Sequence, residues 1–150
     1  MQRRKFLSLG ALAAVVAFVP ANVSAEDYRT TKPETWQAHS VNDAMMKLYG
    51  TTTTIEKGIK LVAPDVAANG GAIPVDIKSD IPAKSVAIFQ DANPEATVGV
   101  YTMSEDAIID YSIKIKMKKS GTITVVVEGT DGKFYSAKKT LDVALGGCEG

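Results

Sequence analysis

Residues 110–145 have the sequence DYSIKIKMKKSGTITVVVEGTDGKFYSAKKTLDVAL, which contains three runs rich in β-branched and aromatic residues. The runs are Asp110–Met117, Thr122–Glu128 and Lys133–Leu145, and residues that favour turns lie between them. Short runs of this composition, bounded by turn residues, are typical of β-strands. The stretch therefore predicts three consecutive strands.

Two local patterns say how these strands are arranged. In the first run, apolar residues alternate with polar ones: Tyr111, Ile113, Ile115 and Met117 against Ser112, Lys114, Lys116 and Lys118. This alternation predicts one buried and one solvent-exposed face, although the lysines would also suit a partner surface. The pair Asp131-Gly132 between the other two runs allows a positive φ, so those two strands are predicted to form an antiparallel hairpin.

Four similar runs lie upstream, and the fold class follows from all seven. They are Ile59–Val62, Ile73–Ile77, Ser85–Gln90 and Thr97–Met103. No segment between the runs is long enough for a crossover helix, which argues against a parallel βαβ sheet. The predicted fold is mainly β, an immunoglobulin-like antiparallel β-sandwich.

One short helix is predicted before the first strand. Ser40 is a suitable N-cap, Asp43 places negative charge in the first turn, and Gly50 suits a left-handed stop. The residues between them include an apolar stripe at helical spacing: Val41, Ala44, Met45, Leu48 and Tyr49. Met45 and Met46 are interpreted as packing residues. The preceding segment, Glu26–Thr35, is polar and without an apolar period, which predicts an extended arm.

The first 25 residues have the features of a cleaved export signal. A cationic start at Arg3, Arg4 and Lys5 precedes the apolar run Phe6–Val19, and Val23-Ser24-Ala25 resembles a cleavage site. Adjacent arginines are typical of the twin-arginine route, which predicts a periplasmic location. The alternative is a membrane anchor, but the 14 apolar residues are fewer than the roughly 20 that span a bilayer.

Composition excludes several classes of function. The 150 residues are 45% hydrophobic and 23% charged, as in one globular domain. Removing three of the 17 cationic residues with the signal leaves 14 against 17 acidic ones, so the mature chain carries a net charge near −3. This charge argues against binding to nucleic acid or to a membrane surface. One His and one Cys cannot form a zinc or iron–sulfur site, so no metal or cofactor is expected.

Cys148 is the residue best suited to chemistry. It is the sole cysteine and lies between Gly146-Gly147 and Glu149-Gly150 at the carboxyl end. Glycines give the backbone freedom and no cover, so residues 146–150 are predicted to be a flexible arm on a domain spanning residues 26–145. Glu149 and the terminal carboxylate oppose thiolate formation, so the thiol needs activation by a partner.

The residues alone leave two hypotheses for Cys148. The thiol is either an attachment point that visits other proteins, or it forms an intermolecular disulfide in an exported structural or interaction module. A Cys–His hydrolase using His39 is disfavoured, because no motif or oxyanion donors accompany that residue. His39 is more simply a residue at the helix entry.

The terminal Gly146–Gly150, together with the export signal and the order of helix and sandwich, resembles the SoxY family of the bacterial thiosulfate-oxidising Sox system. Residues 59–75, the pair Asn93-Pro94 and the hairpin 131–143 also resemble family segments. The family tail is Gly-Gly-Cys-Gly-Gly, whereas this chain has Glu149 at the fourth position. That departure bears on which sulfur species is carried more than on the carrier role.

The resemblance implies a carrier rather than an enzyme. In the family, a haem protein, SoxAX, joins thiosulfate oxidatively to the cysteine, and a manganese-dependent hydrolase, SoxB, releases sulfate. A sulfane dehydrogenase oxidises the remaining sulfur in some systems. By resemblance, Cys148 would hold these intermediates covalently, and the chain would form a heterodimer with a related sandwich subunit, SoxZ.

Overall fold

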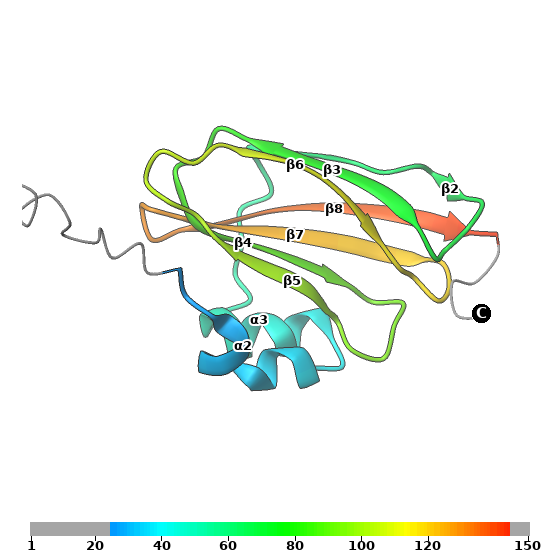
Figure 1. Ribbon diagram of the computed structural model, residues 1–150, viewed down its shortest axis with the longest axis horizontal. Coiled ribbons are helices and arrows are strands. Elements are labelled where there is room, and N and C mark those ends of the chain that lie inside the picture. Colours follow the sequence, from blue (N-terminus) through cyan, green and yellow to red (C-terminus); the bar gives the residue numbers. More distant parts are fainter. Residues whose placement is uncertain (1–24, 145–150) are drawn as a thin grey trace, which may run out of the picture.

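The computed structural model describes residues 25–144, which form two β-sheets and a small helical layer (Figure 1). The strands are β1 Ile59–Val62, β2 Val66–Ala67, β3 Ile73–Ser79, β4 Ala83–Gln90, β5 Thr97–Thr102, β6 Ile109–Ile115, β7 Gly121–Gly129 and β8 Phe134–Val143. One sheet has the order β1-β3-β6 and the other β2-β8-β7-β4-β5. No helix among the described residues has the length and apolar character needed to cross a membrane.

The predicted antiparallel sandwich is confirmed, with one small exception. All pairs of strands are antiparallel except β2 and β8, which pair in parallel over two residues. No crossover helix is involved, because the chain leaves β2 and reaches β8 only after five further strands. The sequence prediction missed β2, since two residues are too few to show a period.

The main core lies between the two sheets. Alternate residues of β3 and β6 point into it, whereas Lys114 of β6 is exposed, as the alternation predicts. The facing residues of the larger sheet include Val86, Ile88 and Val125, all fully buried. Removal of these apolar side chains from water is the principal force that holds the two sheets together.

The hairpin between β7 and β8 forms where the sequence predicts it. Gly132 has a φ of 78°, a left-handed conformation that residues with a Cβ rarely adopt. The Asp131 carboxylate accepts hydrogen bonds from the Lys133 N–H at 3.0 Å and from the Tyr135 hydroxyl at 2.6 Å. These bonds lower the pKa of Asp131, the Tyr135 bond contributing most.

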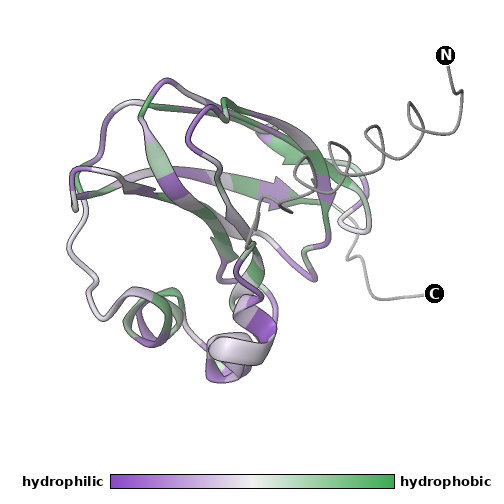
Figure 2. Ribbon diagram, turned by 60° about the vertical axis from the view of Figure 1, so that its left-hand side comes forward, coloured by the Kyte–Doolittle hydropathy of each residue, from purple (hydrophilic) through white to green (hydrophobic). Residues whose placement is uncertain are grey.

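The predicted helix is α3, Val41–Tyr49, and it packs on the outer face of the larger sheet. Ser40 accepts a hydrogen bond from the Asp43 N–H at 3.1 Å, and Gly50 ends the helix with a φ of 71°. Buried Met45 and Leu48 contact the side of the sheet that carries Phe89. Figure 2 shows that this helical layer lies on one side of the sandwich only. In contrast to the packing role predicted for both methionines, Met46 is 51% exposed.

The prediction of an extended arm at Glu26–Thr35 is wrong. The segment contains a helical turn, α2 Tyr28–Thr31, followed by a 3₁₀ helix, η1 Pro33–Gln37. The Asp27 side chain caps α2 by accepting from the Arg29 N–H at 3.1 Å, and Pro33 begins η1, where a missing N–H does no harm. Elements of four and five residues are too short to display an apolar period, so the sequence pattern did not reveal them.

Candidate functional site

The site residues predicted from sequence lie outside the described residues. These are Cys148 and its neighbours Gly146, Gly147, Glu149 and Gly150, and the predicted export signal falls almost wholly in residues 1–24, which are also outside. The structure does describe the base from which the carboxyl-terminal segment extends. That base is the end of β8 and the segments bonded to it.

The end of β8 is fixed by hydrogen bonds from two directions. The Asp142 and Ala144 N–H groups donate to the carbonyls of Asp65 and Ala67, each at 2.9 Å, next to the β2–β8 pair. The Val143 N–H donates to the Ser120 hydroxyl at 2.9 Å. The chain is therefore held firmly up to Ala144. Cys148 is the fourth residue after Ala144, so its Cα lies no more than about 14 Å from that fixed point.

Charged side chains lie near this base. Lys118 and Lys119 are exposed in the turn between β6 and β7, which lies at the same end of the sandwich as the end of β8 (Figure 1). Lys139 of β8 donates to the Asp65 carboxylate, and this hydrogen bond lowers the pKa of Asp65. Asp65 pairs with Lys139, and the exposed Asp142 of β8 adds a second carboxylate at the same strand end, so the base carries charges of both signs.

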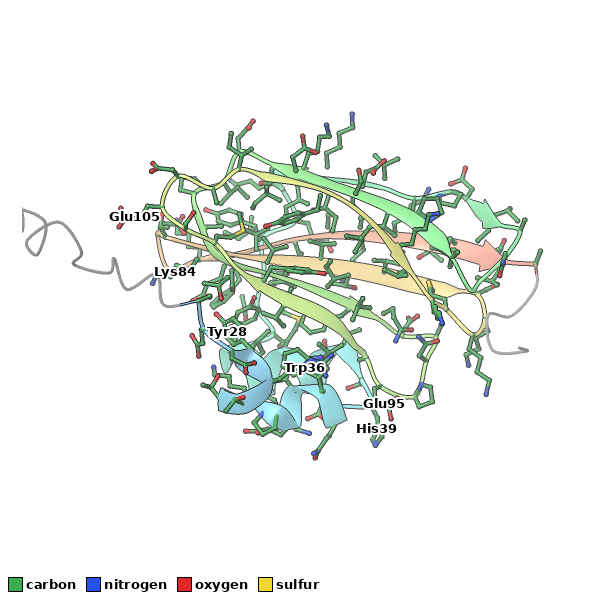
Figure 3. All side chains as sticks on the ribbon, in the orientation of Figure 1. Tyr28, Trp36, His39, Lys84, Glu95 and Glu105 are labelled. Atoms are coloured by element: carbon green, nitrogen blue, oxygen red, sulfur yellow. The ribbon has the colours of Figure 1, made fainter. Side chains whose placement is uncertain are left out.

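His39 joins the helical layer to the turn after β4. Its Nδ1 lies 2.9 Å from the Pro94 carbonyl oxygen, so Nδ1 carries the proton and donates. The side chain is exposed and lies just before α3, in agreement with its interpretation as a residue at the helix entry (Figure 3). Its prospective partner in the disfavoured hydrolase hypothesis, Cys148, lies outside the described residues.

A chain of hydrogen bonds that the sequence analysis missed links α3 to the larger sheet. The Ser85 hydroxyl donates to the Glu128 carboxylate at 2.8 Å and lies 2.8 Å from the Tyr49 hydroxyl, which must donate to it. Burial raises the pKa of Tyr49 above its ordinary value. A serine beside a carboxylate resembles an activated nucleophile, but Ser85 is 0% exposed and no substrate reaches it. The network stabilises the docking of α3.

Open grooves lie elsewhere on the surface. One of about 540 Å³ is formed at the hairpin end by residues of the turns near Gly58, Pro82 and Asp131. Another, about 340 Å³, lies between β5 and the segment that contains α2 and Trp36. Among residues 25–144, no three His, Cys, Asp or Glu side chains are placed to bind one metal ion.

Comparison with known proteins identifies relatives of this fold. The family model described as "Sulfur oxidation protein SoxY" matches residues 45–148, a range that ends at the predicted attachment cysteine. No curated protein matches the chain closely enough to count as a relative.

Solved structures also resemble it. The sulfur carrier protein SoxY from Chlorobium limicola f thiosulfatophilum is 29% identical, with a TM-score of 0.63 over 70% of this chain and 96% of that one. A superoxide reductase (neelaredoxin) from Ignicoccus hospitalis is 18% identical, with a TM-score of 0.52 over 58% of this chain and 80% of that one. The second likeness concerns the fold alone.

Proposed function

The chain belongs to the SoxY family of sulfur oxidation proteins, and from this premise we propose that it is a sulfur carrier on which other proteins act. The observation that carries the proposal is that the family match includes Cys148, the sole cysteine of the chain. The likeness to a solved sulfur carrier over 96% of its length supports the same role. Cys148 would hold sulfur derived from thiosulfate in covalent form.

The proposed role consists of a loading step and a hydrolytic step on Cys148. Loading joins the Cys148 thiol to thiosulfate through a new S–S bond, which releases one proton and two electrons, and a SoxAX-like haem protein accepts the electrons. A SoxB-like hydrolase then adds water across the bond to the terminal sulfonate. This second step releases hydrogen sulfate and leaves a persulfide on Cys148. A sulfane dehydrogenase would oxidise that remaining sulfur where the system contains one.

The described base of β8 suits this role. A carrier must present one atom to several enzymes, and the bonds that hold Val143 and Ala144 give the terminal segment a fixed origin. Lys118 and Lys119 directly precede Ser120 and bring positive charge near that origin, where Asp65 and Asp142 bring negative charge. The proposal assigns the catalytic steps to the partner enzymes.

We place the mature carrier in the periplasm, after export and removal of residues 1–25. The support is the sequence pattern alone: the twin arginines, the short apolar run and the small residues before Glu26. The Sox family further implies a second sandwich subunit like SoxZ as a heterodimer partner.

Intact-mass analysis tests the proposed role. The protein is isolated from the periplasm of cells grown with thiosulfate, with cells grown without it as the comparison. We expect adducts that a thiol reductant removes and that are missing in Cys148→Ala, with Cys148→Ser as a second control. An unmodified mass during active thiosulfate oxidation would refute the proposal. A dominant disulfide-linked homodimer on a non-reducing gel would favour the interaction module instead.

A further inference from the structure

Strand β8 runs past the end of its neighbour β7. The register between the two strands ends at Gly121 and Leu141, so residues 142–144, here called the strand extension, have no partner in β7. Leu141 is 2% exposed and packs in the core. Beyond it, Asp142 and Ala144 are exposed and Val143 is half-buried. Because little of the strand extension is buried, hydrogen bonds are the main interactions that hold it to the domain.

These hydrogen bonds hold the strand extension from both sides. On one side, two of its N–H groups donate to the carbonyls of Asp65 and Ala67, each at 2.9 Å, beside the β2–β8 pair (Figure 1). On the other side, where β7 has ended, the Val143 N–H donates to the Ser120 hydroxyl at 2.9 Å. Continuing the register of β7 would place Lys119 opposite Val143, but residues 118–120 form a bend. The Ser120 side chain therefore replaces the strand carbonyl that β7 does not provide.

The strand extension determines how far Cys148 can reach. While the extension is held, Cys148 is the fourth residue beyond a fixed point at Ala144, and its Cα lies within about 14 Å of that point. If the extension detaches, the fixed point moves back to Leu141, and the limit becomes about 24 Å. A longer flexible chain lowers the effective concentration of the group at its end. The bonds to the extension therefore set both the reach and the effective concentration of the thiol.

We propose that Ser120 is a positioning residue of the carrier: its hydroxyl holds the strand extension on the domain and thereby sets the length of chain on which Cys148 moves. The inference rests on the proposed function, because a thiol that visits other proteins needs a defined reach. One hydrogen bond contributes ~1 kcal/mol, so its loss should raise the detached population about fivefold. The attached form still predominates, because the bonds to Asp65 and Ala67 remain.

Amide hydrogen exchange of the mature chain, followed by NMR, tests whether Ser120 holds the strand extension. The Asp142 and Ala144 amides are the reporters, because they bond to the β2 side and not to Ser120. We expect Ser120→Ala to speed their exchange about fivefold. Ser120→Thr keeps the hydroxyl and should change their exchange by less than about twofold. Ser112→Ala should have as small an effect, because it removes an exposed hydroxyl that bonds to Asp76 in the other sheet.

A shortened chain tests whether this bond sets the reach of the thiol. Deletion of Leu145 and Gly146 keeps one glycine before Cys148 and limits its Cα to about 7 Å from the held strand extension. With the extension detached, the limit in the shortened chain is about 17 Å, which exceeds the natural reach. We therefore expect the deletion to slow loading with thiosulfate by the SoxAX-like haem protein, measured by intact mass, at least about tenfold. Adding Ser120→Ala should then speed loading of the shortened chain about fivefold.

This gain distinguishes positioning from a merely structural role, because a structural defect slows loading of both chains. In the chain of natural length, Ser120→Ala should change the loading rate by less than about twofold. Unchanged exchange of the two reporter amides in Ser120→Ala would overturn the inference. It would also be overturned by faster exchange without faster loading of the shortened chain, by an equal gain in Ser112→Ala, or by a shortened chain that loads at the natural rate.

Failure of the carrier role has a different signature. The exchange measurement needs no thiosulfate and reports on the hydrogen bond alone. A wild-type chain that never loads, with the exchange response intact, would refute the carrier role and the positioning role together.

Discussion

Replacing Leu48 with alanine tests whether the helical layer is an integral part of the folded domain. Leu48 is 0% exposed and packs in the cluster that contains Phe89 and Val126 of the larger sheet. The change removes three carbon groups, worth about 2.4 kcal/mol at ~0.8 kcal/mol for each buried methylene. The cavity left behind adds to this, so we expect a loss of about 3 kcal/mol in the free energy of unfolding.

The assay is urea unfolding of the mature chain, followed by circular dichroism. Met46→Ala is the matched control, because Met46 is on the same helix and is 51% exposed. Alanine is at least as good a helix former as leucine or methionine, so neither change acts through helix propensity. We expect the control to stay within about 0.5 kcal/mol of wild type. A loss below about 1 kcal/mol for Leu48→Ala would mean that α3 is only loosely attached to the sheet.

Two further predictions concern the pH dependence of stability and the rate at which Cys148 is loaded. Burial raises the pKa of Tyr49 in the folded chain, so its contribution to stability is complete below the ordinary value of 10.0 and is lost as pH rises above it. Tyr49→Phe should therefore lose stability less steeply than wild type between about pH 9 and 11 in urea unfolding, and a parallel decline would contradict this. Glu149→Gly and Glu149→Gln should both speed loading of Cys148 by the haem protein, by up to about fivefold at low salt, since either removes a charge worth at most ~1 kcal/mol against the dianionic thiosulfate. Time-resolved intact mass measures this rate, and a gain in the glycine variant alone would assign the effect to bulk.

Local signals in the sequence predicted the elements that local interactions stabilise. Ser40 and Gly50 bound α3 because a hydroxyl cap and a left-handed residue act within one turn. Asp131-Gly132 located the hairpin for the same reason. In contrast, α2 and η1 depend on tertiary packing. One example is the packing of Tyr28 against the buried cluster that contains Phe89 and Leu48. Asp27 and Pro33 are recognisable in the sequence as residues that favour the start of a helix. Without an apolar residue at each helical turn, however, these two residues do not predict a helix.

The helical layer on the larger sheet could have been predicted from the burial of two strands. Ile123–Val127 in β7 and Ser85–Gln90 in β4 are buried without interruption, so both of their faces are covered. The run Val125–Val127 shows this in the sequence, because a strand with one wet face alternates. The periodicity of α3 says that one helix face is buried, but not which sheet receives it. Similarly, the place of β5 as the last strand of the larger sheet depends on strand order, which single runs do not specify.

The hydrogen bonds that hold the end of β8 limit how any enzyme of the pathway can approach the carrier. Because Val143 and Ala144 are tied to Ser120 and Ala67, a deep catalytic cleft cannot draw extra backbone out of the sandwich. Its mouth must instead accommodate the folded end of the domain, including β2 and the turn that holds Lys118 and Lys119. On the proposed function, enzymes with unrelated chemistry would converge on similarly shaped entrances, and a substitution in that turn would impair several reactions at once.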